Sequence, residues 1–133
     1  MVTTDDVVLI AEEYRAELPP GFDAVSQELV VLLQSDAPIQ ALARGPGDSM
    51  NHRIRQAALQ ELRGLLCTND RRYSDVRAHG KVITRTSLAS VASYVAGAVG
   101  ISAGMAMACV AFVALAVANV SVGTFCRLVD EKN

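Results

Sequence analysis

Residues 101–118 read ISAGMAMACVAFVALAVA, and Ser102 is the single polar side chain among them. An α-helix rises about 1.5 Å per residue, so a helix of this length approaches the roughly 30 Å thickness of the apolar core of a bilayer. A helix that is apolar on every face is buried either in lipid or in protein. These residues therefore predict a long buried helix, and the fold depends on what surrounds it.

The uncharged region is longer than this helix. No charged side chain occurs in 86–126, between Arg85 and Arg127. Gly100 is typical of a helix C-cap and Ser102 of a helix N-cap, so we expect the region to break between them. The resulting helix pair has an amphipathic first member, too short to span a bilayer, and a long apolar second member that is rich in alanine and glycine.

The composition of the uncharged region complicates the membrane interpretation. Of its 41 residues, 11 are alanine, five are serine and four are glycine, whereas only two are leucine. Insertion scales reward leucine, isoleucine, phenylalanine and valine, so the second helix lies near the threshold for insertion. Both lipid and a protein core stay open as its surroundings.

Residues 1–81 predict helices as well, because apolar side chains recur every three or four positions behind capping residues. No segment sustains the alternation of a strand. We therefore expect an all-α fold with about five amphipathic helices before the helix pair. The expected helices cover approximately 5–18, 23–34, 36–43, 49–65 and 70–80, with breaks at 19–21, 44–47 and 68–69. In the fourth of them the expected inward residues are Ile54, Ala58, Leu62 and Leu65, and the expected water-facing ones are Arg53, Arg55, Gln56, Gln60 and Arg63.

Charge divides the chain into blocks. Residues 1–48 hold nine acidic and two basic residues, whereas 49–85 hold eight basic and three acidic ones. Either these blocks pair inside the molecule, or the basic block contacts anionic lipid or an acidic partner. The candidate contact residues are Arg71, Arg72, Arg77, Lys81 and Arg85. Nucleic acid is not favoured as a partner, because Tyr73 is the one aromatic residue in this cluster and no RNA-binding motif accompanies it.

Small residues recur every four positions along part of the uncharged region. They are Ala92, Ala96, Gly100, Gly104 and Ala108, and the two glycines form a GxxxG motif. Such a seam lets helices approach closely, and it suits either an oligomer interface or tight packing within one protein. The seam is continuous only if the helix does not break at Gly100.

The first residues and the cysteines bear on the compartment. The chain begins with MVTTDD, which has neither the basic start nor the apolar stretch of a secretory signal. We therefore expect a cytoplasmic N-terminal region, at the inner or plasma membrane or, alternatively, in a cytoplasmic soluble protein. Cys67, Cys109 and Cys126 form no CxxC pair and are expected to be reduced packing residues. A bridge between Cys67 and Cys126 is the alternative in an oxidising compartment.

No motif in the chain indicates catalysis. Gly47, Asp48 and Ser49 imitate the opening of a lipase-type serine hydrolase, but Ser49 precedes a helix and suits a helix cap. His52 and His79 stand among arginines, without carboxylates at metal-ligand spacing, and are expected on the surface. We therefore predict that the protein is not an enzyme and has no metal, cofactor or small-molecule substrate.

Two functions suit this architecture, which we divide into an amphipathic helical domain over 1–81 and an apolar hairpin or membrane-inserting segment over 82–133. In the first, a small membrane-associated protein self-associates, anchors a partner or perturbs the bilayer. In the second, a soluble helical adaptor uses 103–125 as its core helix, wrapped by the amphipathic ones. The expected partner is a second copy or another helical protein, with membrane lipid added in the first case.

Overall fold

The computed structural model describes residues 4–34, 50–67, 85–120 and 125–127, and these ranges contain helices and no strand. The elements are α1 (Thr4–Tyr14), the 3₁₀ helix η1 (Arg15–Glu17), α2 (Phe22–Gln34), α4 (Met50–Leu66), α5 (Arg85–Val99) and α6 (Ala103–Val120). The all-α prediction is confirmed. The expected helices at 36–43 and 70–80 lie outside the described residues.

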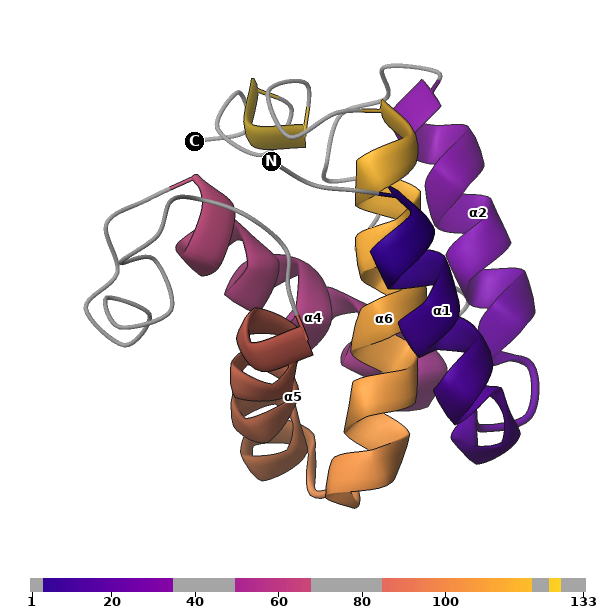
Figure 1. The fold of residues 1–133 in the computed structure, drawn as a ribbon, viewed down its shortest axis with the longest axis vertical. Coiled ribbons are helices and arrows are strands. Elements are labelled where there is room, and N and C mark those ends of the chain that lie inside the picture. The colour runs from indigo at the N-terminus through magenta and orange to yellow at the C-terminus, as the bar shows by residue number, and fades with distance from the viewer. Residues whose placement is uncertain (1–3, 35–49, 68–84, 121–124, 128–133) are drawn as a thin grey trace.

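The apolar helix α6 lies at the centre of the bundle. Figure 1 shows α1 and α2 along one side of it and α4 and α5 along the other, and α6 contacts all four of them. Its buried residues are Ala106, Met107, Ala108, Cys109, Val110, Ala111, Val113, Ala114, Ala116 and Val117. Half of these are alanines, whose small side chains let the neighbouring helices come close. Protein therefore surrounds most of α6.

The surrounding helices bury the apolar stripes that their periodicity predicts. The buried residues include Val7, Ile10 and Ala11 of α1, Phe22 and Leu29 of α2, and Ile54, Ala58, Leu62 and Leu65 of α4. Together with buried residues of α5 and α6 they form one hydrophobic cluster. Helices on both sides of the expected domain boundary at residue 81 thus share a core.

The connection between α5 and α6 follows the predicted capping pattern. Gly100 has a φ of +83°, a left-handed conformation that residues with a Cβ rarely adopt. Two residues later, Ser102 Oγ accepts a hydrogen bond of 3.1 Å from the Met105 N–H, which caps the start of α6. The two helices are bent by 117° at this point. The predicted break at 100–102 is confirmed.

Length and composition were the grounds for considering a membrane span. Among the described residues, no individual helix is both long and apolar enough to cross a membrane. The helices α5 and α6 meet that requirement only when taken together, across the sharp bend between them.

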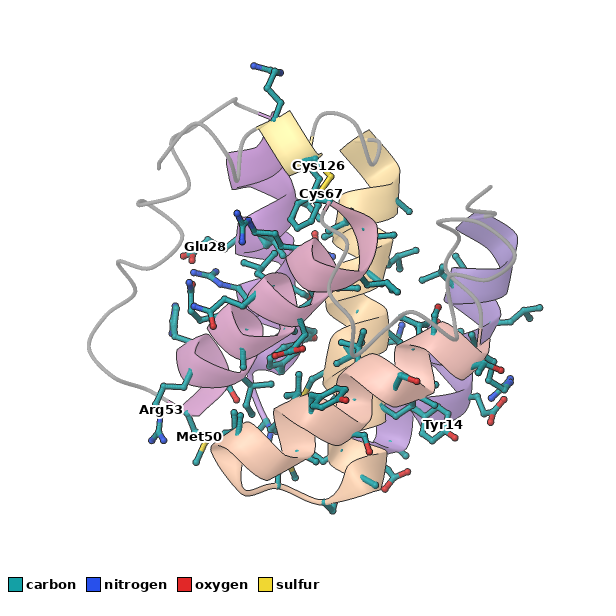
Figure 2. The ribbon with its side chains drawn as sticks, turned by 90° about the vertical axis from the view of Figure 1, so that its left-hand side faces the viewer. Tyr14, Glu28, Met50, Arg53, Cys67 and Cys126 are labelled. Atoms are coloured by element: carbon teal, nitrogen blue, oxygen red, sulfur yellow. A yellow bond between two sulfur atoms is a disulfide. The ribbon has the colours of Figure 1, made fainter. Side chains whose placement is uncertain are left out.

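A disulfide bond joins Cys67 to Cys126, as Figure 2 shows. The expectation that all three cysteines are reduced is therefore wrong. The two positions are 59 residues apart in the sequence, but the fold brings the end of α4 beside the helical turn at 125–127. Their Cα atoms lie 5.4 Å apart, within the range that a disulfide requires. Cys109 is free and buried in α6, as expected of a packing residue.

Candidate functional site

The bend at Gly100 divides the small-residue seam. Ala92 and Ala96 lie on α5, Gly104 and Ala108 lie on α6, and Gly100 lies in the turn between the two helices. The five positions therefore do not form one straight helical face. Ala92 and Ala108 are buried inside the bundle, whereas Ala96 and Gly104 are half-buried. A role of these residues in self-association stays a prediction.

One end of the seam opens into a cavity between α1, α5 and α6. Its volume is about 320 Å³, and its lining consists of Tyr14, Arg85, Ala89, Ala92, Ser93, Ala103, Gly104 and Met107. The structure thus brings Ala92 and Gly104 together across the helix pair. Small and apolar side chains make up most of the lining, and the polar side chains present are Tyr14, Ser93 and Arg85.

Arg85, at the edge of this cavity, belongs to the cluster that we expected to contact lipid or an acidic partner. Its guanidinium donates two hydrogen bonds, of 2.8 and 3.0 Å, to the carboxylate of Glu13 on α1. These hydrogen bonds lower the pKa of Glu13 and raise the pKa of Arg85. Both side chains are about half exposed, so the pair fastens the start of α5 to α1 only weakly. The other expected contact residues, Arg71, Arg72, Arg77 and Lys81, lie outside the described residues.

A second ion pair joins α4 to α2. Arg55 is fully buried, so its expected place on the water-facing side of α4 is wrong. Its guanidinium donates to Glu28 Oε1 at 2.8 Å and to the carbonyl oxygen of Val25 at 3.3 Å. At this position, a face of α4 that would be wet in an isolated helix meets α2. Arg53, labelled in Figure 2, is exposed as expected.

The carboxylate of Glu28 faces two basic side chains. Its hydrogen bond with Arg55 lowers the pKa of Glu28, and His52 contributes to the same shift. The Nε2 atom of His52 lies 3.8 Å from Glu28 Oε1. The ion pairs Glu13–Arg85 and Glu28–Arg55 both join the acidic block at 1–48 to the basic block at 49–85. The opposite charge of these blocks was therefore the sequence signal for the pairing, although it did not identify the partners.

A carboxylate of the chain itself lies beside the start of α6. The carboxylate of Glu17 lies against Gly104, at a place where a Cβ atom on residue 104 would collide with it. Negative charge is favourable near a helix N-terminus, because the free backbone N–H groups point outward there. Sequence periodicity did not indicate this contact, since Glu17 and Gly104 belong to helices far apart in the chain.

The chemistry available in the described residues is limited. These residues hold no group of three or more His, Cys, Asp or Glu side chains that could bind a metal ion. Burial raises the pKa of the Cys109 thiol to about 12, so this thiol is protonated at neutral pH and is a poor nucleophile. The serine of the hydrolase-like motif, Ser49, and the second histidine, His79, lie outside the described residues.

The chain was also compared with known proteins. No family model, curated protein or solved structure matches it. Functional inference therefore rests on the packing of α6 and on the contacts around it.

Proposed function

We propose that this protein is a non-enzymatic helical interaction module, in which α6 is the core and the amphipathic helices carry the binding surface. The burial of α6 by four other helices supports this proposal most strongly. An apolar helix whose surface is buried by other helices of its own chain needs no lipid to bury it. The helices that cover α6 then have their outer faces available for a second copy or another helical protein.

The polar contacts are consistent with a binding function rather than with catalysis. The pairs Glu13–Arg85 and Glu28–Arg55 each join two helices. Catalysis requires an acid, a base or a nucleophile converging on one reacting atom. In the part of the chain that the structure describes, the charged side chains named here hold helices together instead.

A second candidate function is association with a membrane through α5 and α6. It is favoured by the side chains at the partly exposed positions of α6, which include Met105, Phe112 and Leu115 and are all apolar. A core helix with an edge toward water more often carries polar side chains at that edge. Because α6 is otherwise buried, membrane association requires α6 to leave the bundle.

Centrifugation of the purified, oxidised protein in buffer without detergent separates the two candidates. The interaction module predicts a folded species that stays in the supernatant, does not float with phosphatidylcholine and phosphatidylglycerol vesicles, and protects the amides of α6 from hydrogen exchange. Flotation of the oxidised protein with vesicles would overturn the first candidate in favour of the second. Rapid exchange throughout α6 without vesicles would contradict its role as the core.

A further inference from the structure

The disulfide bond closes a loop that contains the whole α5–α6 pair. Cys67 directly follows α4, and Cys126 lies in the turn at 125–127, beyond α6. Every residue of α5 and α6 therefore lies between the two bridged positions. Figure 2 shows the bridge at the end of the bundle where α4 and the C-terminal end of α6 meet.

The two ends of this helix pair are attached in different ways. At the start of α5, Leu88 is buried, and Arg85 forms a half-exposed ion pair with Glu13. Beyond the end of α6, the attachment is the covalent bond at Cys126, next to the fully buried ring of Phe125. The disulfide is a covalent link beside the main chain, and it holds the segment beyond α6 to the end of α4. Both cysteine residues are half-buried and pack against the edge of the hydrophobic cluster.

We propose that this disulfide is a redox latch, and that its reduction frees α6 to enter a lipid bilayer. This proposal goes beyond the interaction module. It names reduction of the disulfide as the condition under which the second candidate function, association with a membrane, takes place. Lipid is the favoured destination because residues 103–118 carry no polar side chain on any face. A groove on a partner protein would cover one face of such a helix, whereas lipid covers all of them.

The reductant is a protein or small-molecule dithiol. One of its thiolates attacks a sulfur of the bridge, which forms a mixed disulfide and releases the first cysteine as a thiolate. Its second thiol then displaces the other cysteine. The reductant leaves as a disulfide, and two electrons and two protons have passed to Cys67 and Cys126.

Cys109 reports on the position of α6. It is the free cysteine of the three in the chain, and it is buried in the middle of α6. We compare maleimide labelling of Cys109 in the oxidised protein and in the double variant Cys67→Ser, Cys126→Ser, without vesicles. The latch predicts labelling at least tenfold faster in the double variant, because loss of the bridge removes its constraint on opening. The variant Cys109→Ser controls for labelling at other sites, and circular dichroism checks that the helices persist.

Flotation with phosphatidylcholine and phosphatidylglycerol vesicles tests the destination. The oxidised protein should stay at the bottom of the gradient, whereas the dithiol-treated protein and the double variant should float. Reoxidation before vesicles are added should restore the first result, which shows that reduction has not simply destroyed the fold. Leu115→Arg, at a half-buried position of α6, should abolish flotation of the reduced protein, because a charge at mid-helix opposes insertion.

The remaining outcomes are also decisive. Equal labelling of Cys109 in the oxidised protein and the double variant would overturn the latch and leave the interaction module intact. If Cys109 of the double variant is labelled fast but the protein does not float with vesicles, or sediments without them, lipid is not the destination of α6. Flotation of the oxidised protein would contradict both the latch and the interaction module, and so is distinguishable from failure of the latch alone.

Discussion

The two helices of the uncharged region differ in how much of their surface the protein covers. On α5 one face is buried, by residues that include Leu88, Val91 and Val95, and Ser93 and Tyr94 are among the exposed residues. On α6 nearly every face is buried. The reason is position, since α6 contacts α1, α2, α4 and α5 whereas α5 packs mainly against α4 and α6. Apart from Arg85 at the start of α5, neither helix carries a charge, so the difference in burial comes from how many other helices contact each one.

A charge placed in each helix tests this difference most strongly. Val113 of α6 is fully buried, so Val113→Arg should lower the free energy of unfolding by more than about 4 kcal/mol, enough to unfold a small domain. The matched change Ala98→Arg, on the exposed face of α5, should alter it by about 0.5 kcal/mol or less. Urea denaturation followed by circular dichroism gives both values. Similar losses for the two variants would show that α5 is as enclosed as α6.

Removal of the disulfide is the next largest change. The double variant Cys67→Ser, Cys126→Ser should lose about 4 kcal/mol of unfolding free energy, because the open chain gains the entropy of a loop of about 60 residues. Cys109→Ala deletes a buried sulfur without touching the bridge, and should cost about 1 kcal/mol. Guanidinium titration of the parent protein, the double variant and Cys109→Ala gives the three unfolding free energies. Their differences compare the contribution of the disulfide with that of the packing around Cys109. A double variant as stable as the parent would mean that packing alone holds α6 in place.

Local features of the sequence predict the helices and their breaks, whereas the contacts between helices depend on the assembled fold. Periodicity and caps act within a few residues, which is why the break at Gly100 could be placed in advance. The bridge between Cys67 and Cys126 depends on two helix ends meeting in space, and no local pattern records that meeting. The burial of Arg55 has the same origin, because the pattern within α4 cannot show that α2 packs over it.

Acid should weaken the ion pair between α2 and α4 more than the ion pair between α1 and α5. The pKa of Glu28 is lowered by Arg55, so the folded state is favoured above the usual value of 4.5, and this contribution is lost as the pH falls below it. Because Glu28 is about half exposed, the loss should be about 1 kcal/mol or less. Glu28→Gln should flatten the decline of stability between pH 5 and 3 more than Glu13→Gln, whose partner Arg85 is exposed. The reverse order would mean that the exposed pair at α5 contributes more than the pair that joins α2 to α4.

The smallest expected changes in stability come from replacing each of the two glycines of the GxxxG motif by alanine. Gly100 has a positive φ, so Gly100→Ala should cost about 1 kcal/mol through backbone strain, although no side chain lies in its way. Gly104 is helical, and a methyl group there meets only the end of the Glu17 side chain, which can rotate aside. Gly104→Ala should therefore change the free energy of unfolding by less than about 0.5 kcal/mol, because the gain in helix propensity offsets the displaced carboxylate. If thermal unfolding instead shows Gly104→Ala to be the more damaging change, the Glu17 side chain cannot rotate aside, and its contact with the start of α6 holds η1 in place.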